Sequence, residues 1–364
     1  MPKWMTTEHP AIVFEDSQVG RLKKEVWDAS DAEIDGILKQ YGIPSPSLLA
    51  APGAYLQTTP RAAVEENRRK NDIVILPVAS TERHGDHSCS GHDLFQVTQL
   101  IEGLWRHTRR QGHPVNLAFS PLNYGGHPYH HIGMPGTVIL PEEVVRETLV
   151  HVMLGLWNDG FRKQLIINNH GQLWMLESAL QEFMYRYQLP GIFQIFDWHR
   201  CVREFFTPCE KTGWETDFVH SAEAETSLGL LLFPEGMIDM RHAVDGAGKA
   251  YLPGGHFDTS VDPYGRPHRW SEGEGHIAIE LSATPHGAVG KPSVADAKKA
   301  RRPVAAILRY LTLVHDEILE RFPPGTVPPV EEVTLRTQEE MAPYLKEPGS
   351  PGWKPVYALP RRGF

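Results

Sequence analysis

The chain has 364 residues, of which 41% are hydrophobic and 22% are charged, and this composition predicts one elaborated domain or two small ones around a large core. The formal net charge is -9, and basic residues occur only in short groups such as residues 68–70, which argues against a nucleic-acid-binding protein. No apolar run approaches the roughly twenty residues that cross a bilayer. Three cysteines without zinc-finger spacing, and no signal-peptide core, predict a cytoplasmic location.

Strands and helices alternate along the chain, so we expect an α/β fold with a mostly parallel sheet and helices on both faces. Ser30 to Glu33 has the pattern of a capping box at a helix start. Further elements are expected, in chain order, as a strand over 72–80, a helix over 93–110, a strand over 115–121, helices over 141–158 and 173–187, a strand over 191–198, and a helix over 294–320 with Ser293 as its N-cap.

Three regions look like additions to this core, which we place at residues 71–321. Residues 1–70 form an amino-terminal extension, and the proline-rich residues 322–364 predict an extended arm that wraps a neighbouring subunit. Residues 239–275 form an insertion rich in Gly, Pro, Asp and His that contains Trp270. Long loops of this kind are often functional. A lid with substrate contacts and an oligomer contact are the two interpretations of the insertion.

Metal-type ligands are concentrated where the first core strand ends. Residues 82–93 read Glu-Arg-His-Gly-Asp-His-Ser-Cys-Ser-Gly-His-Asp, with three histidines and three carboxylates in twelve positions. In open α/β sheets, ligands bind beyond the carboxyl ends of the strands. Mixed histidine and carboxylate sets without thiolates suit zinc, manganese or iron and are commoner in catalytic than in structural sites. The pattern therefore predicts a metallohydrolase.

Two later segments carry the same kind of signal. A second apolar strand runs into Asn168, Asn169, His170, Gly171 and Gln172. A third segment, His220-Ser-Ala-Glu-Ala-Glu-Thr-Ser, opens a helical stretch. At about 100° per residue, Glu223 and Glu225 point in different directions, so one site cannot easily use both as direct ligands.

These motifs, in this order, resemble the creatininase (creatinine amidohydrolase) family. Residues 82–85 with Asp93 resemble its Glu-x-His-Gly…Asp motif, residues 168–171 its Asn-Gly-His-Gly motif, and residues 220–227 its His-Ala-Gly-x-x-Glu-Thr-Ser motif. Residues 134–137 and 287–295 are similar to its Phe-Pro-Gly-Thr and Gly-x-x-Gly-Asp-Pro-x-x-Ala segments. The resemblance covers about residues 70–320 and implies a two-metal site, ring-opening hydrolysis of a small cyclic substrate, and assembly into homo-oligomers, often hexamers.

Carried over by motif, the metal ligands are Glu82, His84, Asp93, His170 and Glu225, with Asp93 bridging two ions. Creatininase has a metal-binding glutamate where this chain has Gln172, so we assign the remaining carboxylate to Glu225, with Glu223 as the competing assignment. For proton transfer we expect His220, oriented by Asp217 three residues earlier. Contacts to the substrate or to the ligands are expected, beside Trp270, from His87, His92, His130, His131, Gln172 and Glu223.

Two chemistries fit this set. A divalent ion lowers the pKa of a bound water to about 7, and the resulting hydroxide can attack the carbonyl of a cyclic amide or one ketone of a ring diketone. The resemblance extends to hydrolases of oxidised inositols or keto sugars, and the polar loop at residues 85–92 and the chain length favour this second chemistry. A non-catalytic structural or regulatory metal module is the alternative, although such sites favour cysteine-rich ligand sets. Divalent metal ions are the only cofactors expected.

Overall fold

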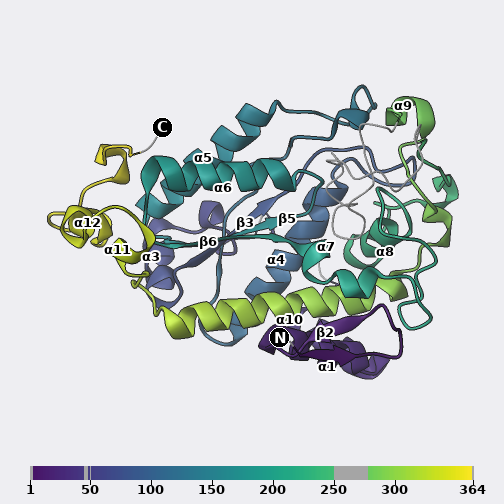
Figure 1. Cartoon of the computed structure of the whole chain (residues 1–364), viewed down its shortest axis with the longest axis horizontal. Coiled ribbons are helices and arrows are strands. Elements are labelled where there is room, and N and C mark those ends of the chain that lie inside the picture. Colours follow the sequence, from purple (N-terminus) through teal and green to yellow (C-terminus); the bar gives the residue numbers. More distant parts are fainter. Residues whose placement is uncertain (1–2, 45–47, 50, 250–277, 363–364) are drawn as a thin grey trace.

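The computed structural model describes residues 3–44, 48–49, 51–249 and 278–362. Trp270 and most of the predicted insertion lie outside the described residues. The centre of the molecule is a sheet of four parallel strands in the order β4-β3-β5-β6 (Figure 1). Its strands are β3 (Ile73–Val78), β4 (Asn116–Leu117), β5 (Lys163–Asn168) and β6 (Ile192–Asp197). The predicted α/β class with a parallel sheet is confirmed.

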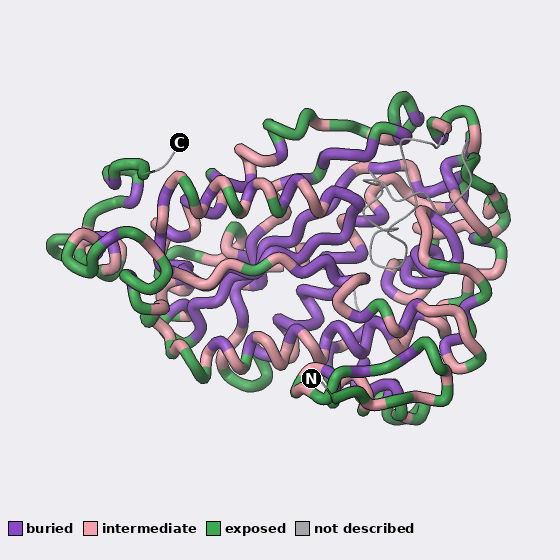
Figure 2. The backbone as a smooth tube through the Cα atoms, viewed as in Figure 1, coloured by how far each residue is buried: buried purple, intermediate pink, exposed green. Residues whose placement is uncertain are grey.

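Side chains of β3 alternate between two hydrophobic cores, one on each face of the sheet. Ile73 and Ile75 belong to one core and Val74, Leu76 and Val78 to the other, because successive side chains of a strand point to opposite faces. The first core contains residues from α4 (His92–Arg110), α8 (Glu223–Leu232) and α10 (Ala297–Arg321), and the second contains residues from α5 (Glu142–Asn158) and α6 (Leu173–Tyr187). Figure 2 shows the strands buried between these layers.

Two predicted boundaries differ from the structure. The expected strand over 115–121 shortens to β4, because the backbone N–H of Phe119 donates to the side chain of Gln57 and leaves the β3 ladder. The N-cap of α10 is Asp296, whose side chain accepts from the N–H of Lys298. Ser293, the predicted cap, instead donates its hydroxyl to Asp245.

Most of the amino-terminal extension packs on the first core, and Val64 of its last helix belongs to the second. It contains β1 (Trp4–Thr6), β2 (Val13–Glu15), α1 (Gln18–Asp28), α2 (Asp31–Tyr41), η1 (Leu56–Thr58) and α3 (Arg61–Lys70). The capping box at Ser30 and Glu33 is present as predicted. Trp27 packs against Phe205 of the core with ring centroids 5.8 Å apart, and the hydroxyl of Tyr55 donates to the buried Glu102 of α4. The extension therefore shares its hydrophobic core with the sheet.

The carboxyl tail does not form the extended arm that its prolines predict. It contains α11 (Val330–Val333), α12 (Gln338–Leu345) and η7 (Val356–Ala358), and it folds back on its own chain beside α5 and α6. Met341 and Val356 are buried in the second core. The guanidinium of Arg162 donates to the carbonyl oxygens of residues 344, 345 and 346. Apolar contacts and buried arginines thus outweigh the extended preference of proline.

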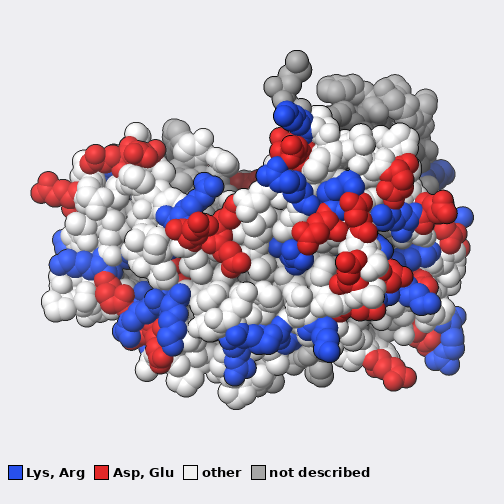
Figure 3. Space-filling model, turned by 90° about the horizontal axis from the view of Figure 1, so that it is seen from below, with Lys and Arg blue, Asp and Glu red and all other residues white. Residues whose placement is uncertain are grey.

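The remaining elements of the described residues are short. They are η2 (Tyr129–His131), α7 (Trp198–Cys201), η3 (Arg203–Phe206), η4 (Met240–His242), α9 (Glu280–Ala283) and η6 (Pro292–Val294). Among the helices of the described residues, none has the length and apolar character needed to cross a membrane. On the face formed by α10 and the amino-terminal elements, basic and acidic side chains intermingle (Figure 3), as in the ion pair between Arg302 and Asp31.

A second buried arginine, Arg336, also holds the tail, and its removal should destabilise the protein. Arg336 donates to the carbonyl oxygens of Tyr187 and Pro360, and it pairs with Glu340. We expect Arg336→Ala to lower the free energy of unfolding by about 2 to 4 kcal/mol, because the buried Tyr187 carbonyl and two part-buried acceptors lose their donor. Urea denaturation measures this loss. The exposed Arg321→Ala is the control, and an equal effect of the two substitutions would contradict the anchoring role of Arg336.

Candidate metal centre

Five of the predicted ligands converge at the carboxyl ends of β3 and β5. The loop after β3 contributes Glu82 and His84, the first turn of α4 contributes Asp93, and the loop after β5 contributes His170. Glu225 comes from the first turn of α8. All five side chains are buried, with exposed fractions of 1 to 3%. Parallel strands end at the same edge of a sheet, which explains why segments so distant in the chain meet here.

The ligand atoms form two sets that share Asp93. In the first set, His84 Nε2 lies 3.2 Å from Asp93 Oδ1 and 3.5 Å from Glu225 Oε2. In the second, His170 Nδ1 lies 3.1 Å from Asp93 Oδ2 and 3.0 Å from Glu82 Oε2. The two oxygens of Asp93 therefore face different histidines, as a carboxylate that bridges two ions would require.

Several of these atoms lie close together without hydrogen bonding to one another. Glu82 Oε1, His84 Nε2 and Asp93 Oδ2 are buried and have no hydrogen-bond partner in the structure. Buried polar groups are rarely left unpaired, because desolvation without compensation costs free energy. Ligand atoms that lie this close together without hydrogen bonding to one another can surround a divalent cation.

Each ligand-type histidine is oriented by a backbone carbonyl. His84 Nδ1 lies 3.1 Å from the carbonyl oxygen of Glu82, and His170 Nε2 lies 2.8 Å from that of Gly126. A carbonyl can only accept, so these nitrogens carry a proton, and the other nitrogen of each ring, which faces the carboxylates, is the one that would bind a cation when deprotonated. Metal-binding histidines characteristically donate their second ring N–H in this way.

The electrostatics of the cluster attract positive charge. Burial alone lowers the pKa of His170, but Glu82 and Asp93 raise it to about 9. Burial likewise opposes the charge of Glu82, yet His220, His131 and His170 hold the pKa of Glu82 well below its usual range. Three carboxylates in so small a buried volume need compensation, either from protons on the imidazoles or from a cation.

The structure distinguishes Glu225 from Glu223. Glu225 faces His84 and accepts a hydrogen bond of 2.6 Å from the backbone N–H of Ser221, which adopts a left-handed φ of 52°. Glu223 points away from the cluster, accepts from the backbone N–H groups of residues 215 and 216, and pairs with Lys299. The predicted divergence of the two side chains on one helix is confirmed, and Glu223 does not contact the site.

His220 lies at the rim of the cluster. Its Nδ1 is 3.5 Å from Glu82 Oε1, and its side chain is 12% exposed, more than any of the five predicted ligands. Its Nε2 lies 2.8 Å from the carbonyl oxygen of Arg83, which must accept the ring proton. The predicted orienting role of Asp217 is wrong, because Asp217 is exposed and the Arg83 carbonyl already binds the nitrogen remote from the cluster.

Two predicted substrate contacts instead support the ligands. His92 stacks on His84 with ring centroids 4.6 Å apart and an interplanar angle of 4°, and its nitrogens bond Ser88 and Gln96. The side chain of Gln172 accepts from the N–H of Gly126, whose carbonyl orients His170. Both side chains have their polar atoms engaged within the protein, so neither is available to a substrate.

The remaining predicted residues occupy different positions. His87 is buried and bonds Thr226 through Nε2. His131 lies with Nδ1 3.0 Å from Glu82 Oε1, and His130 is its neighbour in η2. Sequence reasoning missed His127, whose Nδ1 lies 3.9 Å from Glu82 Oε1 and whose Nε2 bonds Ser80. Its position within Gly-Gly-His, just before the other two histidines, was the available signal.

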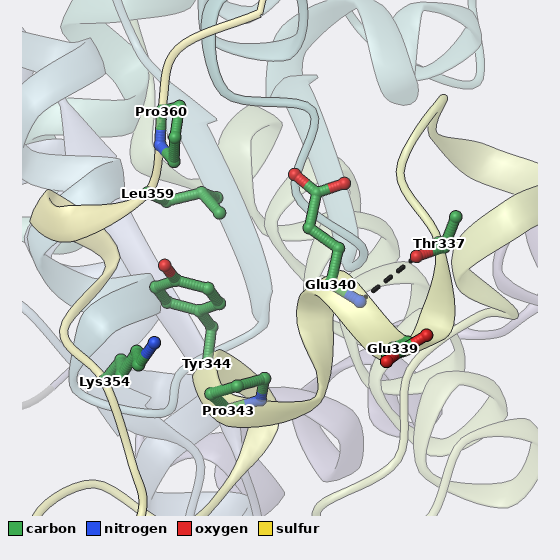
Figure 4. Close-up of a pocket in the computed structure, with 8 residues that line it drawn as sticks. All are labelled: Thr337, Glu339, Glu340, Pro343, Tyr344, Lys354, Leu359 and Pro360. Atoms are coloured by element: carbon green, nitrogen blue, oxygen red, sulfur yellow. Dashed lines mark hydrogen bonds between the residues drawn. The ribbon is translucent and has the colours of Figure 1, made fainter.

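Gln96 and Asn169 were also missed, although Asn169 lies inside a motif. Gln96 Nε2 donates to Asn169 Oδ1, and Asn169 Nδ2 donates to the backbone oxygen of Asp93. Hydrogen bonds thus connect His92, which stacks on one ligand, to the backbone of a second. A separate hollow of about 490 Å³ lies away from the strand ends that carry the ligand cluster. Tyr344, Pro360 and neighbouring tail residues line it (Figure 4).

Comparison with known proteins identifies the family. The model of the creatininase family, described as creatinine amidohydrolase, matches residues 57–314. The chain belongs to the creatininase family. It is 41% identical over 306 residues to a 3-dehydro-scyllo-inosose hydrolase of Thermotoga maritima, covering 84% of this chain and 96% of that relative. It is 27% identical over 210 residues to a creatinine amidohydrolase of Pseudomonas putida, covering 54% of this chain and 76% of the relative.

Solved structures of the creatininase family share the fold. A crystal structure of creatinine amidohydrolase (creatininase) matches with a TM-score of 0.54 at 19% sequence identity, covering 77% of this chain and all of the other. A structure of the manganese form of creatininase matches with a TM-score of 0.53 at 19% identity, covering 74% of this chain and 99% of the other. The family and fold predicted from the motifs are confirmed.

The stacked His92 should control metal affinity without binding metal. We expect His92→Ala to weaken divalent-metal binding by about 10- to 100-fold, because His84 loses the ring that fixes its plane. Competition with a chromogenic chelator measures this affinity. His107→Ala, at the far end of the same helix, is the matched control. Unchanged affinity in His92→Ala would show that the stack does not position His84.

Proposed function

We propose that this protein is a metal-dependent hydrolase that opens the ring of an oxidised inositol or a related keto sugar. The observation that carries the proposal is the pair of buried donor sets sharing Asp93, in a chain 41% identical to a relative named for that hydrolysis. Glu82, His84, Asp93, His170 and Glu225 would hold two divalent ions, with zinc, manganese and iron all suited to these ligands. Such ions supply a water nucleophile at neutral pH and positive charge for a developing oxyanion.

The overall reaction balances as the addition of one water to a ring diketone. The water oxygen bonds to one ketone carbon, and the bond from that carbon to the carbon between the ketones breaks. The electron pair of this bond passes to the central carbon as an enolate conjugated with the second ketone. A proton then adds to the central carbon, so the product is an open-chain keto acid.

His220 has the geometry for the proton transfers. With Nε2–H donating to the Arg83 carbonyl, the lone pair of Nδ1 faces the ligand cluster, 3.5 Å from Glu82 and 3.9 Å from Glu225. A base held in one tautomer and at the rim of the cluster can take a proton from water and deliver it to the enolate carbon. The carbonyl of Arg83 thus performs the orienting role that we expected from Asp217.

The preference for a ring diketone over a cyclic amide rests on the relatives and not on the polar loop. The relative named as an inosose hydrolase is more similar, and over more of the chain, than the one named as a creatinine amidohydrolase. Of the loop side chains, His92 bonds Ser88 and Gln96 through both ring nitrogens, and His87 bonds Thr226 through Nε2, so three of these four nitrogens serve the protein's own hydrogen bonding.

Assembly and location complete the proposal. We propose a homo-oligomer, of which the hexamer is the form implied by family resemblance. Large apolar side chains are exposed near the site, including Ile132 at 56% and Leu281 at 44%, and exposed apolar patches often mark subunit contacts. Its three cysteines are free, which fits a reducing cytoplasm.

Ring opening of the two substrate types tests the function directly. We expect metal-loaded protein to hydrolyse 3-dehydro-scyllo-inosose and to leave creatinine intact, with the loss of each substrate and the appearance of its product followed by liquid chromatography. Glu82→Gln and His84→Ala should each reduce the rate roughly 10³-fold, because each removes a ligand whose ion stabilises the transition state. The exposed Glu339→Gln is the control. Activity that survives both ligand substitutions would refute the site, and hydrolysis of creatinine alone would reassign the bond cleaved.

The role of His220 can be separated from metal binding. We expect His220→Ala to lower kcat by about 10²- to 10⁴-fold while the metal content per chain stays unchanged, because general acid–base catalysis contributes a factor of that size. Atomic emission of the dialysed protein gives the metal content. The exposed His242→Ala controls for loss of a histidine. A parallel loss of metal would instead identify His220 as a ligand.

A further inference from the structure

A second cluster of titratable side chains adjoins the metal centre and has no part in the mechanism above. Glu280, the first residue of α9, is only 6% exposed, and its Oε1 lies 3.4 Å from His131 Nε2 and 4.0 Å from His130 Nε2. The other ring nitrogen of His131 lies 3.0 Å from Glu82 Oε1. A single imidazole ring therefore separates Glu280 from a proposed metal ligand.

Glu280 retains hydrogen-bonding capacity toward a ligand. A carboxylate has about four acceptor positions, and among the described residues the two imidazoles that face the Glu280 side chain use at most two of them. Burying a carboxylate is unfavourable unless its oxygens find donors. Burial also lowers the pKa of His130 to about 4, so at neutral pH its ring is uncharged and has one donor and one acceptor nitrogen. The cluster can thus accept from a polar ligand and donate to it.

We propose that Glu280, together with His130, binds the ring hydroxyl groups of the substrate and makes the site specific for a polyhydroxylated ring. This inference rests on the proposed function, since it concerns the part of the same substrate remote from the reacting ketone. Hydroxyl groups donate to carboxylates and accept from imidazole N–H groups. Glu280 lies across the His131 ring from the proposed ligand Glu82, with His131 Nε2 3.4 Å from Glu280 and Nδ1 3.0 Å from Glu82. A small amide ring without hydroxyl groups gains nothing from this carboxylate.

A third metal ion is the competing use of the same three side chains, which offer ligand atoms within reach of one another. The geometry favours hydroxyl binding. The 4.0 Å between Glu280 and His130 exceeds every distance, 3.0 to 3.5 Å, that joins a carboxylate to a histidine of the proposed ligand set. His131 is moreover already turned toward Glu82 through its other nitrogen.

The test compares a hydroxylated ring with a bare one. We measure kcat/KM of metal-loaded wild type, Glu280→Gln and Glu280→Ala on 3-dehydro-scyllo-inosose and on cyclohexane-1,3-dione, which has the two ketones but no hydroxyl group. Where turnover of the dione is slow, its inhibition constant replaces kcat/KM. We expect both variants to lose roughly 10- to 100-fold on the hydroxylated substrate, mainly through KM, as for one charge-assisted hydrogen bond. The dione constants should change less than about twofold, and Glu339→Gln should match wild type.

The outcomes separate this inference from the function on which it rests. Failure of the wild type to open the hydroxylated ring refutes the proposed function. Opening by the wild type with unchanged constants in both Glu280 variants refutes the role of Glu280 alone. An equal loss on both substrates, or a fall in metal content per chain, would assign Glu280 to the metal centre instead of to hydroxyl recognition.

Discussion

Burial of Glu82, Asp93 and Glu225 within one small volume is the constraint on which the rest of the site depends. Carboxylates so close together and so fully removed from water repel one another, and their charge must be balanced locally. Neutral imidazoles carry no positive charge that could provide this balance. Protonated imidazoles or divalent cations can provide it. The unpaired ligand atoms and the shared Asp93 follow from this requirement.

The fold meets this requirement with rigid backbone. β3 and β5 pair in register from Ile73–Lys163 to Val78–Asn168, so the loops that carry Glu82, His84 and His170 leave the sheet at the same level. The ring N–H groups of the two histidines are then fixed by two carbonyls, that of Glu82 in the loop after β3 and that of Gly126 in the segment after β4. The carboxyl tail packs elsewhere, where Arg162 and Arg336 bind it. The tail can therefore stabilise the molecule without taking part in the chemistry.

A second layer of polar side chains distinguishes this site from a bare ligand set. His92 stacks on one ligand, Gln96 and Asn169 connect it to the backbone of Asp93, and Gln172 holds the Gly126 segment whose carbonyl orients His170. Because these side chains hydrogen-bond to one another or to the backbone, they fix the positions of the proposed ligand residues. In the proposed arrangement, His130 and Glu280 bind the hydroxyl groups of the substrate.

The sequence by itself determined the core strands and their parallel arrangement, because apolar runs are local features that need no knowledge of packing, and the family motifs at the strand ends supplied the candidate ligand residues. It also separated Glu223 from Glu225, since helical periodicity sends their side chains apart. Only the tertiary structure decided that Asp217 is exposed to solvent, that His92 stacks on a proposed ligand, and that Glu280 lies beside His131. Those contacts join residues whose relative placement depends on how loops close over the sheet, and no local pattern encodes that closure. The tail likewise contradicted its proline content, because burial of residues such as Met341 against distant helices outweighs a local backbone preference.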